Sequence, residues 1–213
     1  SAGSFEGLKA SIGNGADSIY FGSDRFSARN KAPNFDDKIM EEAIDYAHLR
    51  SVKAYLALNT LISDEEMEIA CEIAMDAYSY GIDAIIIQDL GLASRLKNKM
   101  PEIVLHSSTQ ATIYDKNGIL ACRNAGISRI ILPRELSLSQ IKELTGFADT
   151  LGLETEIFIH GALCVSYSGQ CLMSSIIGGR SSNRGECAQP CRLSYSLLEG
   201  NKIILGNTPL LAT

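Results

Sequence analysis

Short apolar runs alternate along the chain with longer amphipathic segments. The apolar runs, which are rich in isoleucine, leucine, alanine and aromatic residues, cover positions 18–22, 53–59, 84–89, 103–108, 129–135 and 156–161. Continuous apolar runs of this length are typical of strands that are buried on both faces of a parallel sheet. Because successive runs begin 19 to 35 residues apart, the pattern predicts a series of βα units.

Three of the intervening segments show a helical pattern. The segment 35–51 opens with acidic residues, which stabilise the amino-terminal end of a helix. The segment 63–81 has Ser63 as its expected N-cap, Glu66 as the capping-box partner of Ser63, and Gly81 as its end. The segment 137–148 shows a weaker version of the same pattern, so we predict a helix in each of the three.

Polar residues gather where the predicted strands end. These positions are Gly22 with Arg25, Asn59, Gln88, Asp89, 107–110, Arg134, Glu135, His160 and Gly161. All strands of a (β/α) barrel end on one rim, and that rim carries the site. No G-x-G-x-x-G or G-x-x-x-x-G-K loop follows any of the runs, so the usual phosphate-binding loops of doubly wound sheets are missing. The pattern therefore favours a barrel.

The predicted fold is an α/β, incomplete TIM-barrel-like (β/α) domain, followed by a Cys-rich loop and a small β-hairpin. A full barrel has eight strands and about 250 residues, whereas six runs are found in 213 residues. We expect a fragment that lacks at least one strand at its start and one near its end. The expected boundaries are 1–162 for the barrel portion and 163–213 for the Cys-rich loop and the hairpin, whose turn is placed at Gly200 and Asn201.

Composition narrows the class of protein. The net charge of −6 argues against broad, non-specific binding of nucleic acid, although it leaves room for a local basic patch. No apolar run is long enough to span a membrane, and the first residues do not resemble a signal peptide. We therefore expect a cytoplasmic protein, in which clustered cysteines indicate a metal or redox site more than structural disulfides.

Four of the six cysteines lie close together, with the spacing C-x6-C-x15-C-x3-C. They are Cys164, Cys171, Cys187 and Cys191. Four thiolates surrounded by glycines can form a tetrahedral metal site, and on spacing alone zinc, an iron–sulfur cluster and redox thiols all stay open. Cys71 and Cys122 lie on apolar helix faces and are expected to be buried.

The segment 156–174 resembles the signature of peptidase family U32, the collagenase-like proteases. The matching positions are Glu156, Phe158, Gly161, Ala162, Leu163, Cys164, Gly169, Cys171, Met173 and Ser174. Similarity to the family extends over 2–22, 25–35, 106–115 and 133–141, and so over almost the whole chain.

The resemblance implies a barrel-like αβ fold and one of two activities. One is the historical activity, peptidase, with a collagen-like peptide as substrate. The other is oxygen-independent hydroxylation of tRNA, rRNA or a ubiquinone precursor, with a 4Fe–4S cluster and with prephenate as the small-molecule oxygen donor. The ligands implied for the cluster are Cys164, Cys171 and Cys187, with Cys191 as the fourth, although some relatives use a later cysteine in its place. A non-catalytic iron–sulfur scaffold subunit, in a homo- or heterodimer, is a third reading.

The residues themselves favour the hydroxylase. The chain contains no H-E-x-x-H motif and no G-x-S-x-G motif. A Cys164–His160 dyad is the arrangement that a cysteine peptidase would use, but a nucleophile has no use for three further cysteines in one loop.

Arginines are the groups expected to bind a dicarboxylate donor, because a guanidinium meets a carboxylate with two hydrogen bonds. Arg25 and Arg134 are the candidates on the rim, and Arg29, Arg180 and Arg184 flank the loop. Asn59 and Gln110 are expected either to orient a ligand or to cap the following helix. The predicted catalytic set is therefore Arg25, Asn59, Gln110, Arg134 and His160.

Overall fold

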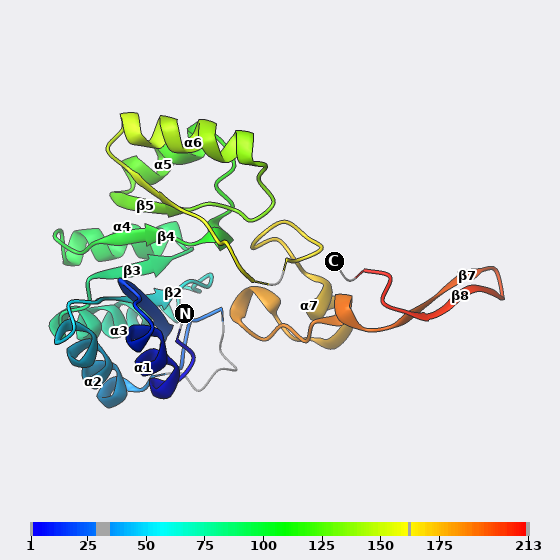
Figure 1. Ribbon diagram of the computed structural model, residues 1–213, viewed down its shortest axis with the longest axis horizontal. Coiled ribbons are helices and arrows are strands. Elements are labelled where there is room, and N and C mark those ends of the chain that lie inside the picture. The colour runs from blue at the N-terminus through cyan, green and yellow to red at the C-terminus, as the bar shows by residue number, and fades with distance from the viewer. Residues whose placement is uncertain (1, 29–34, 162, 212–213) are drawn as a thin grey trace.

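The computed structural model describes residues 2–28, 35–161 and 163–211. In these residues six parallel strands form one curved sheet in the order β1-β2-β3-β4-β5-β6, and helices α1 to α6 lie around its outer side (Figure 1). The elements of this half-barrel are α1 (Phe5–Gly13), β1 (Ser18–Gly22), α2 (Asp37–His48), β2 (Lys53–Leu58), α3 (Met67–Ser79), β3 (Ala84–Ile87), α4 (Leu90–Lys99), β4 (Leu105–Ser107), η1 (Thr109–Ala111), α5 (Lys116–Asn124), β5 (Ile127–Ile131), α6 (Leu138–Thr150) and β6 (Glu154–Glu156). The predicted α/β half-barrel is confirmed.

Both faces of the sheet are buried, as the continuous apolar runs predicted. Alternate residues such as Leu56 and Ile85 face the helices and belong to the large core cluster. Their neighbours Tyr55 and Ile86 face the inner side, where they form a second, smaller apolar cluster. Because each strand pairs parallel with the next, all six strands end at the same edge of the sheet.

The last strand lies earlier than predicted. The run 156–161 was expected to be a strand, but β6 ends at Glu156, and Ile159 is 93% exposed. The register explains the shift, because Arg129 of β5 is paired with Glu154 and Ile131 with Glu156. The chain therefore leaves the sheet soon after Glu156, and His160 lies in a bend.

The helix caps differ from the prediction in one place. Helix α3 begins at Met67, so Ser63 is not its N-cap, although the Glu66 carboxylate accepts a hydrogen bond from the Ser63 N–H at 3.0 Å. Helix α6 instead has the complete capping box, in which Ser137 and Gln140 each bond to the backbone N–H of the other. Helix α2 begins as expected after Asp36, whose side chain accepts from the Ile39 N–H.

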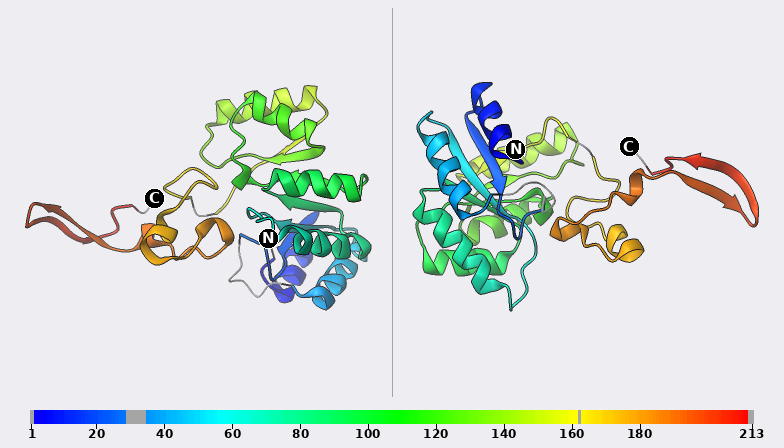
Figure 2. Two further views of the ribbon diagram at one scale, coloured as in Figure 1. Left: turned by 180° about the vertical axis from the view of Figure 1, so that it is seen from behind. Right: turned by 90° about the horizontal axis from the view of Figure 1, so that it is seen from below.

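The residues after 162 form an extension on the side of the carboxyl ends of the strands. Its elements are α7 (Met173–Gly178), η2 (Ser182–Arg184), η3 (Pro190–Arg192), β7 (Tyr195–Glu199) and β8 (Lys202–Thr208). The predicted hairpin is confirmed, since β7 pairs antiparallel with β8 across Gly200 and Asn201. Both further views show this hairpin projecting away from the half-barrel (Figure 2).

Candidate functional site

Amide and hydroxyl side chains connect the carboxyl ends of β2, β3 and β4. Asn59 Oδ1 accepts from the backbone N–H of Ala28 at 2.9 Å, and Asn59 Nδ2 donates to Ser108 Oγ at 3.3 Å. Gln110 Nε2 donates to the Asn59 carbonyl oxygen at 2.9 Å, and Gln88 Nε2 donates to the Gln110 carbonyl oxygen at 3.1 Å. Internal hydrogen bonds thus occupy the amides of Asn59 and Gln110 and fix the loops on the rim.

The extension docks on this rim through Ser168 and Gly169. Ser168 donates to the Glu135 carboxylate through its backbone N–H and, at 2.9 Å, through its hydroxyl, while its carbonyl oxygen accepts from Thr112 Oγ1 at 2.8 Å. Gly169 has φ +77, and a Cβ built on it would lie 2.2 Å from the Gln110 carbonyl oxygen. Only glycine allows so close an approach in this backbone conformation.

Glu135 is the charged member of this contact. Burial opposes its ionisation, but hydrogen bonds from Ser168 and from its own backbone, together with the nearby Tyr114 hydroxyl, outweigh burial and lower the pKa of Glu135. Burial, and next the adjacent Glu135, raise the pKa of Tyr114. Glu135 is therefore an anion that holds the cysteine-bearing segment against the barrel.

All four cysteines of the predicted cluster lie in the extension, and all four are free thiols. Cys164 and Cys187 are exposed, and Cys171 and Cys191 are partly exposed, whereas Cys71 and Cys122 are buried as expected. Within the described part of the chain, no three or more His, Cys, Asp or Glu side chains gather in a way that could hold a metal ion. The assignment of these thiols to one site therefore stays a prediction.

Hydrogen bonds between side chains and backbone nevertheless link the four cysteine segments in two pairs. Ser182 Oγ donates to the Cys171 carbonyl oxygen at 2.5 Å, and the Ala188 N–H, next to Cys187, donates to Ser174 Oγ at 3.0 Å. The two outer cysteines are linked in the same way, because Arg192 Nη2 donates to the carbonyl oxygen of Leu163 at 3.4 Å. Each segment that carries a cysteine thus contacts another part of the same extension.

Cys164 contacts an arginine rather than a histidine. Arg134 Nη2 lies 3.4 Å from Cys164 Sγ. His160 is exposed and makes no hydrogen bond or ion pair with any residue that the structure describes. The arrangement of side chains expected for a Cys164–His160 dyad is therefore not formed among these residues. Arg29, which was expected to flank the loop, lies outside the described residues, as does Ala162 of the signature.

A pocket of about 330 Å³ opens where the β1–α2 and β2–α3 loops meet the extension. Its lining includes Arg25, Thr60, Glu66 and Arg184. Arg184 joins the two parts, because Nη1 donates to the Leu61 carbonyl oxygen at 3.1 Å and Nη2 forms an ion pair with Glu66. This hydrogen-bonded pair lowers the pKa of Glu66. Arg25 is thus at a pocket, while Arg180 donates to the Glu186 carbonyl oxygen within the extension.

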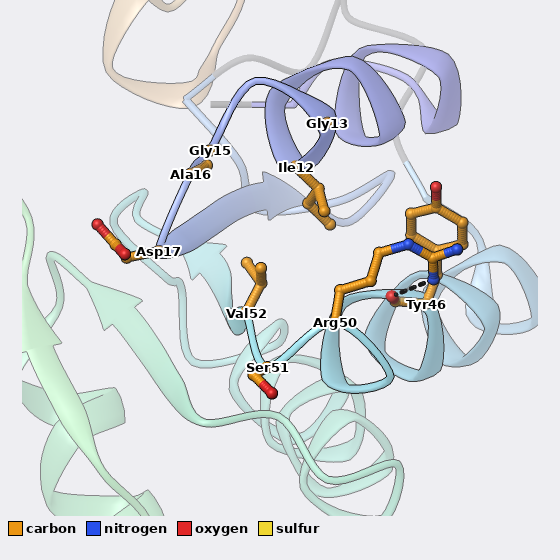
Figure 3. Close-up of a pocket in the computed structure, with 9 residues that line it drawn as sticks. All are labelled: Ile12, Gly13, Gly15, Ala16, Asp17, Tyr46, Arg50, Ser51 and Val52. Atoms are coloured by element: carbon orange, nitrogen blue, oxygen red, sulfur yellow. Dashed lines mark hydrogen bonds between the residues drawn. The ribbon is translucent and has the colours of Figure 1, made fainter.

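A second pocket, of about 320 Å³, lies at the opposite end of the sheet (Figure 3). It is lined by Ile12 near the end of α1, and by Asp17 and Val52 in the loops that precede β1 and β2. Arg50 lies over the Tyr46 ring at 3.5 Å from its centroid and donates to the Tyr46 carbonyl oxygen at 3.0 Å. Because sites of barrel proteins lie at the carboxyl ends of strands, this pocket is not part of the candidate site.

The sequence did not point to Arg129 or Tyr55, which lie on the inner face of the sheet. Arg129 forms ion pairs with Glu154 at 2.6 Å and with Glu156 at 3.4 Å, and donates to Tyr55 Oη at 3.3 Å. His106, 4% exposed, packs against the Tyr55 ring, and its Nδ1 has no partner among the described residues. Burial, and next the charge of Arg129, lower the pKa of His106 to about 4. His106 is therefore neutral and lies inside the half-barrel.

Sequence reasoning also missed Thr60, Thr112 and Ser168. Thr60 follows Asn59 directly at the end of a run, which was the signal that could have drawn attention to it. Thr112 and Ser168 gave no such signal, because their contact joins two distant parts of the chain.

The described helices are all too short or too polar to cross a lipid bilayer.

Comparison with a family model and with curated proteins identifies one family for the chain. The family model described as peptidase family U32 matches residues 3–208. The 23S rRNA 5-hydroxycytidine C2501 synthase of Escherichia coli K12 is 42% identical over 189 residues, which cover 89% of this chain and 28% of that protein. The tRNA hydroxylation protein P of the same organism is 33% identical over 206 residues, covering 97% and 45%. A collagenase of Porphyromonas gingivalis W83 is 34% identical over 205 residues, covering 92% and 49%.

The chain therefore spans less than half the length of these curated relatives. Among solved structures, the U32 peptidase Mk0906 has a TM-score of 0.56 at 13% identity, over 71% of this chain and 63% of that one. At this identity the likeness shows the fold alone.

Proposed function

Because the chain belongs to peptidase family U32, we propose that it takes part in the hydroxylation of a pyrimidine nucleoside in ribosomal or transfer RNA. The observation that carries the proposal is the identity with the rRNA 5-hydroxycytidine synthase, which is 42% over 189 residues. That stretch spans 89% of this chain, and so most of the half-barrel and the extension. The tRNA hydroxylation protein supports the same class of substrate.

A second part of the proposal concerns a 4Fe–4S cluster on Cys164, Cys171, Cys187 and Cys191. The donor chemistry fits, because four free thiols that reach solvent lie on one extension, and soft thiolates select iron–sulfur clusters or zinc. The hydrogen bonds between the cysteine segments support their convergence. The thiols do not meet in the structure, so ligation requires a local rearrangement of the extension. When bound, the cluster would supply electron-transfer chemistry, and zinc is the alternative metal.

The residues of the chain would bind and position the substrates. Hydroxylation without O₂ needs a donor of the oxygen atom, for which prephenate is the expected compound. Arg134, beside Cys164, carries a guanidinium group of the kind that such a dicarboxylate requires. The Glu135–Ser168 and Gly169–Gln110 contacts would keep the cysteine segment against this rim.

The proposal is tested by mass spectrometry of nucleosides from ribosomal and transfer RNA. A strain that lacks the gene is expected to lose one hydroxylated pyrimidine, and the wild-type gene is expected to restore it. Cys164→Ser should fail to restore it, whereas Cys71→Ala, which changes a buried cysteine in α3, should succeed. An unchanged set of nucleosides in the deletion strain would overturn the proposal.

The cluster is tested separately by iron analysis. Anaerobic purification is expected to give about four iron atoms per chain, as a 4Fe–4S cluster requires, and Cys171→Ser should reduce the iron content strongly. Stoichiometric zinc without iron would show that the thiols bind zinc and not a 4Fe–4S cluster.

The collagenase relative keeps a peptidase as the second candidate. The geometry gives it little support, because Cys164 contacts Arg134 and no histidine is hydrogen-bonded to a cysteine among the described residues. Cleavage of gelatin that is abolished by Cys164→Ser would establish the peptidase instead.

A further inference from the structure

The pocket between the first two βα loops and the extension has an unpaired hydroxyl in its wall. Thr60 is 1% exposed, and its Oγ1 has no hydrogen-bond partner among the residues that the structure describes. Buried hydroxyl groups are normally paired, because an unpaired one loses its bonds to water without replacement. Since Thr60 lines the pocket, a ligand in the pocket is the natural partner of this hydroxyl.

The backbone around the pocket is strained on the same side. Phe26, which also lines the pocket, has φ +58. This left-handed conformation is rare for a bulky residue and is concentrated at functional sites. Phe26 also packs against the apolar core, so the strain is held by the fold and keeps an aromatic side chain in the pocket wall.

The lining carries both hydrogen-bond donors and acceptors for the edge of a polar ligand. Glu66 and Arg184 neutralise each other in an ion pair. The side chains of Arg25, Asp24 and Glu186 have no ion pair or hydrogen bond with other described residues and are exposed at the pocket. The lining thus has two carboxylates and only one guanidinium outside the Glu66–Arg184 pair, so it does not suit a polyphosphate.

We propose that this pocket binds the pyrimidine base of the RNA substrate. A pyrimidine has a flat apolar face that suits Phe26 and Ile69, and an edge with acceptors for Arg25 and donors for the carboxylates. The volume of about 330 Å³ is enough to hold a single nucleobase. Enzymes that modify a base move it out of its stack into such a pocket. Glu186 precedes Cys187, so the base would lie beside the cysteine segment. The inference rests on the proposed function for its choice of RNA.

Binding of cytidine, uridine and adenosine 5′-monophosphates, measured by calorimetry with the purified full-length protein, tests this inference. We expect saturable binding of at least one pyrimidine nucleotide that is several-fold tighter than that of adenosine monophosphate. Thr60→Val should weaken binding about fivefold, as expected for one neutral hydrogen bond, and Arg25→Gln about tenfold. Thr60→Val should melt no earlier than the wild type, because it removes an unpaired hydroxyl. Arg123→Gln, on the exposed end of α5, is the control and should bind normally.

Equal affinities of wild type, Thr60→Val and Arg25→Gln would overturn the inference, as would absence of saturable binding. Its failure is distinct from failure of the proposed function. If the deletion strain loses a hydroxylated nucleoside but both variants restore it fully, the pocket assignment alone is wrong. If RNA is unchanged in the deletion strain but both variants bind pyrimidine nucleotides more weakly, the pocket stands and the proposed reaction is wrong.

Discussion

Gly169 lies so close to Gln110 that a Cβ on Gly169 would be 2.2 Å from the Gln110 carbonyl oxygen. This contact fixes the cysteine-bearing segment on the rim of the half-barrel. Gln110 in turn is held by its hydrogen bond to Asn59. The position of the extension therefore depends on one glycine and on a loop that the polar network holds rigid.

Gly169→Ala is expected to release this contact. A methyl group at φ +77 is strained by roughly 1–2 kcal/mol, and its clash with backbone adds to that cost. Hydrogen exchange should become faster over 163–172, and thermal unfolding should begin earlier. Gly152→Ala is the matched control, because Gly152 has φ +70 but open space around it. Equal effects of the two substitutions would show that the close approach to Gln110 has no energetic role.

Glu135→Gln should weaken the same docking contact by electrostatics. The neutral amide loses the charge that accepts two hydrogen bonds from Ser168, and hydrogen bonds to charged groups contribute about 1.5–3 kcal/mol. Because the pKa of Glu135 is lowered in the folded protein, its contribution is present above the unfolded pKa, near 4.5, and is lost as the pH falls through the folded value. Urea unfolding at pH 7 and at low pH checks this, and the difference between wild type and variant should shrink in acid. A constant difference would exclude Glu135 ionisation as the cause.

His106 should make stability depend on pH in a different range. The folded pKa of about 4 lies below the unfolded value of 6.5, so the unfolded chain takes up a proton first. The contribution is fully present above pH 6.5 and is lost as the pH falls toward 4, by up to about 3 kcal/mol. His106→Phe should flatten the unfolding free energy over this range relative to the wild type. His160→Gln, which changes an exposed histidine, should keep the wild-type slope, and a parallel slope for His106→Phe would contradict the prediction.

The helix caps give a direct comparison of two serines. Ser137→Ala should destabilise the protein by about 1 kcal/mol, because the Ser137 side chain accepts from the Gln140 N–H at the start of α6. Ser63→Ala should have a smaller effect, because α3 begins at Met67. Chemical denaturation of both variants measures the two costs, and the reverse order would contradict the observed helix starts.

Local signals were enough to predict most of the fold. The apolar runs located the strands within a few residues, and Gly200 and Asn201 located the hairpin turn, because each signal lies within the element that it specifies. The predicted strand at 156–161 overlaps β6 only at Glu156, because the register pairs Arg129 with Glu154 and Ile131 with Glu156. The register of a strand depends on its partner strand, so it cannot be predicted from the apolar run alone.

The candidate site could be predicted only in part. The four cysteines and Arg25 stand out as residue types, but the contacts that position them join segments far apart in sequence, such as Gly169 with Gln110 and Arg184 with Glu66. The Thr60 hydroxyl became a candidate only because the structure shows it buried without a hydrogen-bond partner among the described residues. Burial and pairing of this kind depend on the packed molecule and not on the local sequence.

The strictly sequential order of the six strands has a consequence for biosynthesis. Each strand pairs with one that has just left the ribosome, so the sheet can grow one unit at a time without waiting for distant segments. The extension is synthesised last. Ser168 can form its hydrogen bonds with Glu135 and Thr112 only after β4 and β5 have positioned these two residues. The four thiols of the extension thus acquire fixed surroundings late, after the scaffold that holds them is complete.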